Sequence, residues 1–191
     1  FNLRSGAEVA TKVAQFSGDL RNAYDLSVLS GKTYRVVVHL SSGDYWLEMA
    51  DRPVAYLGSD KLGHDPTPEE EKEALENFKS EFEEYEELLG EAVIDEENEE
   101  EIMPTSPLVE AKERLQPVTW AKVDDLEWQG RTIGPYLMFP SLQADHHGES
   151  QELLNLGEEG RAFIYVFPSG YIERAVVYVA YKEDDLSFDQ N

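Results

Sequence analysis

The spacing of the apolar residues changes abruptly at Gly31. Before this point they recur every three or four residues, which is the period of an amphipathic helix. The stripe expected to face the core consists of Val9, Val13, Phe16, Leu20 and Tyr24. Ser5 and Glu8 have the spacing of a capping box, and glycine is a common helix terminator, so we predict one helix between Ser5 and Gly31. The side chains expected to face water or a neighbouring subunit are Lys12, Asp19 and Arg21.

Beyond Gly31 the apolar residues alternate or run together, as is typical of strands. TYRVVVHL (33–40) and DYWLEMA (44–50) predict a hairpin with Gly43 in its turn, and the segments around Pro168-Ser169-Gly170 predict a second hairpin. PVTWAKV (117–123) and YLMF (136–139) predict further strands. Because no crossover helices separate the strands, we expect an α+β fold in which the N-terminal helix lies across antiparallel sheet.

Aromatic residues gather in or beside the expected strands. We expect them to pack in the core or on a sheet face and not to form a ligand platform. They are Tyr45, Trp46, Trp120, Trp128, Tyr136, Phe163, Tyr165 and Phe167.

The charge is concentrated in one segment of the chain. The formal net charge is −24 over 191 residues, and the stretch from Asp65 to Glu101 holds 18 acidic residues against two lysines. We expect a single domain, 1–191, with 65–104 as an acidic, partly helical insertion that is peripheral to folding. Within it, Thr67 and Pro68 are start signals for a helix ending near Gly90. Its apolar stripe consists of Leu75, Phe78, Phe82, Tyr85 and Leu89, and PLVEAKERL (107–115) predicts a short helix.

This charge also restricts function. A strongly acidic surface repels phosphate, so nucleic acids and anionic membrane surfaces are not expected partners. No DxDxDG spacing is present to hold calcium, and a solvated surface is the simpler interpretation of the acidic run. The longest apolar run, AVVYVAY (175–181), is far shorter than the roughly 20 residues of a spanning helix.

Candidate chemistry is sparse. There is no cysteine, and no nucleophile-elbow, zinc-protease, P-loop or dinucleotide motif. His146 and His147 are adjacent, and Asp145 and Glu149 could complete a metal cluster with them. Neighbouring residues rarely point the same way in a strand, however, and the polar, glycine-containing context favours a mobile loop. His39 and His64 are interpreted as structural, so we expect no enzyme and no catalytic, cofactor-binding or metal-binding residue.

Two segments of the chain together match the pattern of a known family. The first is VAQFSGDLRNAYDLSVLSGKTYRVVVHLSSGDYWLE (13–48), and the second is RAFIYVFPSGYIERAVVYV (161–179). The matching positions in the first are Leu20, Arg21, Ala23, Leu26, Leu29, Gly31, Val36, Val38, Gly43, Tyr45 and Trp46. Those in the second are Ile164, Phe167, Pro168 and Gly170. In these positions the chain resembles the GspH/FimT family of minor pseudopilins and minor type IV pilins. The resemblance covers about a third of the chain, and the acidic insertion departs from the family pattern.

The resemblance implies a pilin-like domain whose first helix is the second half of a longer one. The other half would be an N-terminal segment, not contained in this sequence, that anchors the protein in the inner membrane and later packs inside a filament. The implied function is that of a minor pseudopilin in a type II secretion system, located in the periplasm with other minor pseudopilins at the tip of a pseudopilus. No cofactor is implied.

Three other functions stay open. A minor type IV pilin would serve adhesion, motility or DNA uptake, although DNA uptake would require a basic face. A periplasmic cation- or ligand-binding module would use the acidic segment. A hydrolase would use scattered carboxylates, and it would require a cleft in which carboxylates with shifted pKa values cluster.

Overall fold

The computed structural model describes residues 3–54, 64–90, 107–147 and 149–182. The chain divides into two compact units. The first combines Phe1–Asp65 with Thr119–Asn191, and the second is Pro66–Val118. The insertion expected at 65–104 thus falls almost wholly in the second unit, which continues to Val118.

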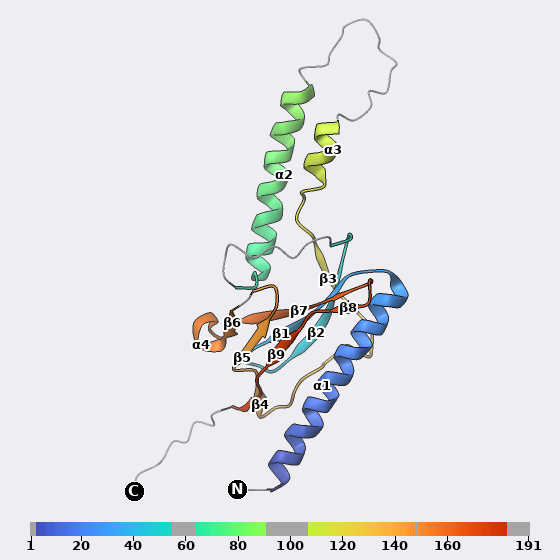
Figure 1. The fold of residues 1–191 in the computed structure, drawn as a ribbon. Helices are drawn as coiled ribbons and strands as arrows, with labels where there is room; N and C mark the ends of the chain where they lie inside the picture. Colours follow the sequence, from blue (N-terminus) through green and yellow to red (C-terminus); the bar gives the residue numbers. More distant parts are fainter. Residues whose placement is uncertain (1–2, 55–63, 91–106, 148, 183–191) are drawn as a thin grey trace, which may run out of the picture. The chain divides into compact units, whose positions relative to one another are not determined.

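The first unit begins with one long helix, α1 (Leu3–Ser30). It starts two residues before Ser5, so Ser5 is not its N-cap, and it ends at Gly31, whose φ of +69° suits glycine. None of the residues 6–15 is buried, whereas Phe16 is 5% exposed and Ala23 is fully buried. The helix therefore packs on the sheet mainly through its second half, and its first turns extend past the strands (Figure 1).

The predicted stripe of α1 is confirmed in part. Phe16 is buried, and Val9, Leu20 and Tyr24 are partly buried against the core. Val13 is 38% exposed, so its placement in the core was wrong.

A five-stranded antiparallel sheet lies against α1, with the strand order β3-β2-β1-β7-β8. Its strands are β1 (Tyr34–His39), β2 (Tyr45–Ala50), β3 (Trp120–Lys122), β7 (Arg161–Phe167) and β8 (Tyr171–Ile172). Both predicted hairpins are confirmed. Gly43 has φ +79°, and a Cβ there would lie 2.5 Å from the Leu137 carbonyl oxygen, so the first turn requires glycine.

The remaining strands form two smaller sheets. β5 (Ser141–Ala144) pairs with β6 (Ser150–Glu152) and β9 (Ala175–Val177), and β4 (Leu137–Met138) pairs with β10 (Ala180–Tyr181). The short helix α4 (Leu153–Leu156) follows β6. The segment after Gly170, predicted as one strand, is thus divided among three sheets, because the chain leaves β7 at Glu173 and joins β5.

The five-stranded sheet has two different faces. Val36, Val38 and Ile164 belong to the core that includes Phe16 of α1. The alternate residues Val37, Phe163 and Tyr165 form a second cluster on the opposite face, with Trp46, Trp120 and Phe167 packed against it. The expected packing of the aromatic residues in the core or on a sheet face is confirmed except for Tyr136, which is 65% exposed.

The second unit contains α2 (Pro68–Gly90) and α3 (Pro107–Glu113). The predicted helix start is confirmed as a capping box: Glu70 N–H donates to Thr67 Oγ1 at 3.3 Å, and Thr67 N–H donates to Glu70 Oε2 at 2.7 Å. The half-buried stripe of α2 contains Leu75, Phe78, Phe82 and Tyr85, as predicted; the side chain of Leu89 lies outside the described residues. No helix in the described part of the chain is long and apolar enough to cross a membrane.

Candidate metal centre

His146 and His147 lie in the turn that follows β5. The turn is closed by a hydrogen bond from His147 N–H to the Ala144 carbonyl at 3.2 Å. In a turn, unlike a strand, two successive side chains can point the same way, and the two ring centroids are 4.2 Å apart. The two histidines thus lie outside the strands, as expected, but their side chains are only 5% and 3% exposed.

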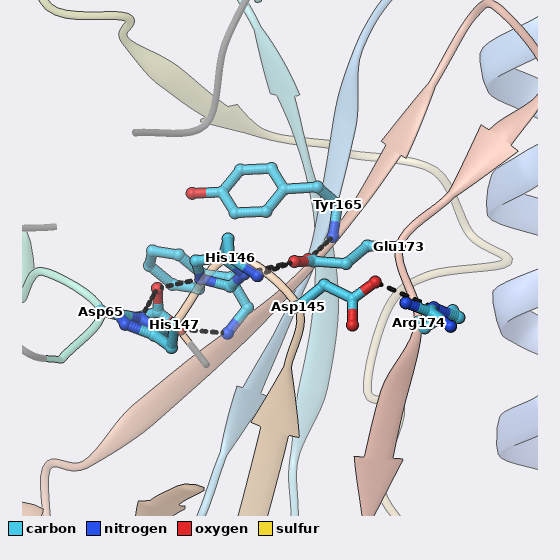
Figure 2. Close-up of polar contacts among 8 residues, drawn as sticks. Asp65, Asp145, His146, His147, Tyr165, Glu173 and Arg174 are labelled. Atoms are coloured by element: carbon cyan, nitrogen blue, oxygen red, sulfur yellow. Dashed lines mark hydrogen bonds and ion pairs between the residues drawn. The ribbon is translucent and has the colours of Figure 1, made fainter. Parts of the chain in front are cut away.

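Two carboxylates from distant parts of the sequence meet these rings (Figure 2). Asp65 Oδ1 lies 2.8 Å from Nε2 of His146 and 2.8 Å from Nε2 of His147. Glu173 Oε1 lies 2.6 Å from Nδ1 of His146. Each carboxylate side chain is 2% exposed. We call these four residues, Asp65, His146, His147 and Glu173, the His–carboxylate cluster.

Strand β7 holds both carboxylates in place. Phe163 N–H donates to Asp65 Oδ2 at 2.6 Å, and Tyr165 N–H donates to Glu173 Oε2 at 3.1 Å. The backbone N–H of His146 adds a 2.7 Å bond to Glu173 Oε1. Where β7 extends beyond the short strand β8, its backbone N–H groups thus donate to carboxylate oxygens and not to a neighbouring strand. These bonds orient the carboxylates toward the imidazoles.

The cluster lies on the sheet face opposite α1. The ring of His146 meets Tyr165 edge-on at a centroid distance of 5.0 Å, and Tyr165 belongs to the second core cluster. All four members of the cluster belong to the first compact unit.

Neither carboxylate considered from the sequence takes part. Asp145 turns away and pairs with Arg174 at 3.0 Å, as Figure 2 shows, and Glu149 is exposed. Asp65 and Glu173 replace them. No local pattern could have identified Asp65, because 81 residues separate it from His146.

Burial and hydrogen bonding shift the pKa values of His146 and Asp65 in opposite directions. Burial lowers the pKa of His146, but the hydrogen bonds and charges of Asp65 and Glu173 outweigh it and raise the pKa to about 9. Burial raises the pKa of Asp65, but its hydrogen bonds to the two histidines bring the pKa below its ordinary value. Without an ion, the cluster therefore contains an imidazolium between two carboxylates.

The donor set also suits a metal ion. One ligand atom from each of Asp65, His146 and His147 can be chosen so that all three lie within 4.8 Å of one another. Imidazole nitrogen and carboxylate oxygen are common ligands of zinc and related divalent ions.

The same sheet face contains a buried ion pair that the sequence analysis did not predict. Arg35 on β1 is 1% exposed and pairs with Glu48 on β2 at 2.6 Å. Its guanidinium lies 4.4 Å from the ring centroid of Trp120 and 3.9 Å from that of Phe163. Two aromatic rings therefore cover the guanidinium of this buried ion pair.

The α1 residues expected to face water differ in their surroundings. Arg21 is exposed and Lys12 is half-buried, but Asp19 is 8% exposed, so its assignment to the outer face was wrong. Asp19 accepts a 2.6 Å hydrogen bond from the Tyr45 hydroxyl and lies 3.5 Å from Arg131. Burial, together with this bond, raises the pKa of Tyr45.

Comparisons with protein-family models, with curated proteins and with solved structures found no match to this chain.

Proposed function

We propose that this chain is the periplasmic domain of a minor pseudopilin, a structural subunit of a type II secretion pseudopilus. The observation that carries the proposal is the way α1 packs. Its buried residues begin at Phe16, while residues 6–15 contain none, over a helix of 28 residues. A helix that packs on its own domain mainly through its second half leaves most of its first half available to neighbouring subunits.

The order of elements supports the same function. A long helix leads directly into the β1–β2 hairpin, and a later hairpin, β7–β8, pairs beside β1 in the same sheet. The sequence resemblance to minor pseudopilins implies the same order of helix, hairpin and late hairpin. The domain would work by assembling with other minor pseudopilins near the filament tip, anchored in the inner membrane through a preceding helix.

Cysteine cross-linking tests this proposal, because the chain has no cysteine of its own. The full-length protein would carry Ala10→Cys, on an exposed position of the first half of α1, in cells that also make its secretion apparatus. The matched control is Leu154→Cys, a 94% exposed position on α4. We expect adducts with other pseudopilus subunits from Ala10→Cys and not from the control.

Two results would contradict the proposal. One is the absence of adducts from Ala10→Cys in cells whose secretion depends on the protein. The other is unimpaired secretion when the gene is deleted. Adducts with major pilin subunits of a surface pilus, in place of pseudopilus subunits, would favour a minor type IV pilin.

A further inference from the structure

We propose that the His–carboxylate cluster binds one divalent transition-metal ion of the zinc class. The ligand atoms are Nε2 of His146, Nε2 of His147 and Oδ1 of Asp65. This inference stands on the side-chain geometry of the first unit and is independent of the filament function.

The ligand atoms are already close to the spacing that an ion requires. Asp65 Oδ1 is 2.8 Å from each Nε2. Around a tetrahedral zinc ion with bonds of about 2.0–2.1 Å, neighbouring ligand atoms are about 3.3 Å apart. Each Nε2 therefore lies within about half an ångström of the distance from Asp65 Oδ1 that such an ion requires.

Glu173 is the carboxylate behind His146: it bonds to the ring nitrogen that would not contact the ion, as is common for metal-binding histidines. Its Oε1 accepts from Nδ1 of His146 at 2.6 Å, so Nδ1 keeps its proton and Nε2, which faces Asp65, is the nitrogen that an ion would take. A carboxylate behind a histidine fixes the tautomer and raises the basicity of the ligand nitrogen. Tyr165 N–H in turn holds Glu173 at 3.1 Å.

The chemistry of the ligands selects the class of ion. Two imidazoles and one carboxylate suit zinc and its transition-metal neighbours, whereas calcium and magnesium prefer sites made of oxygen alone. Three protein ligands leave one position of a tetrahedral ion for water or another donor. Because the side chains are almost fully buried, the ion would act as a structural clamp that joins the turn after β5 to Asp65.

Isothermal titration of the full chain with zinc tests the proposal. Excess magnesium is present throughout, so that the acidic side chains of α2 are occupied before zinc is added. We expect one tight equivalent of zinc. His147→Gln should weaken it at least tenfold, and Glu173→Gln should weaken it by about 10–100-fold. The matched control is His39→Gln, at the end of β1, which should bind as the parent does.

Three results would overturn the proposal. They are no stoichiometric binding in the magnesium background, equal affinity of the parent and His147→Gln, and a loss in His39→Gln as large as in His147→Gln. Should either cluster variant fail to fold, X-ray absorption at the zinc edge of the unaltered protein decides instead. Two imidazole nitrogens in the zinc shell support the proposal, and a shell of oxygens alone refutes it.

Discussion

The two faces of the five-stranded sheet are built in different ways. The face toward α1 is mainly apolar, with fully buried Val36 and Val38 packed in the cluster that contains Phe16, and it includes the buried hydrogen bond from Tyr45 to Asp19. The opposite face contains the Arg35–Glu48 pair, aromatic rings and the His–carboxylate cluster. One face depends on burial of apolar area, and the other depends on polar groups that must all find partners.

This difference changes how each face responds to substitution. An apolar layer loses free energy in proportion to the volume removed and can relax around a gap. A buried polar layer fails more sharply, because the removal of one member leaves its partner charged or unsatisfied. The substitutions below test the difference, beginning with the largest expected effect.

Arg35→Ala should be the most damaging single change. It leaves Glu48 buried without its cation and removes the group between Trp120 and Phe163, so we expect a loss of about 3–5 kcal/mol in unfolding free energy. The control is Arg174→Ala, whose exposed ion pair with Asp145 should contribute far less to the unfolding free energy. Equal losses in denaturant unfolding would show that the Arg35 pair is not a special feature of this face.

Phe16→Ala tests the apolar face. It removes a buried ring that contacts Tyr45 at 4.8 Å and Phe139 at 5.5 Å, between ring centroids, and we expect a loss of about 2–5 kcal/mol. The control on the same helix is Val28→Ala, which is 45% exposed and should cost far less. If both variants melted like the parent, α1 would not be part of the core.

Asp19→Ala should have an intermediate effect. The substitution leaves the buried Tyr45 hydroxyl without its acceptor, which costs about 1–3 kcal/mol. Arg21→Ala, an exposed change two residues away, should stay within about 0.5 kcal/mol. If Asp19→Ala were as stable as the parent, Asp19 would behave as a residue on the outer face of α1.

Removal of the second unit should have the smallest effect on the sheet. We expect that replacing Pro66–Val118 with a short glycine–serine linker leaves cooperative thermal unfolding of the first unit, because the two units are separately compact. Calorimetry measures this directly. A variant without a cooperative transition would show that the acidic segment is required for folding.

The features that were predictable from the sequence are those with local signals. The helical period before Gly31, the turn glycine at position 43 and the capping box at Thr67 each involve residues close together in the chain. Asp19 was misplaced because a charged residue was assumed to face water, although it lies three residues after Phe16 and four before Ala23, on the buried side of α1.

The His–carboxylate cluster could be foreseen only in part. The adjacent histidines were visible as possible ligands, but the sequence suggested the wrong carboxylates, because Asp145 and Glu149 were chosen for their proximity along the chain. Asp65 and Glu173 are held at the site because they accept hydrogen bonds from the backbone N–H groups of Phe163 and Tyr165 on β7. Such contacts are set by tertiary structure and leave no periodic pattern.

The central claim, that the face opposite α1 is built around an ion site, is tested most directly by nuclear magnetic resonance. One equivalent of zinc is added to the ¹⁵N-labelled protein in excess magnesium. The account predicts that the backbone amide signals of His146, His147, Phe163 and Tyr165 shift, while those of Phe16 and Leu20 in α1 stay in place. Shifts confined to the acidic residues of α2, or no shifts at all, would contradict it.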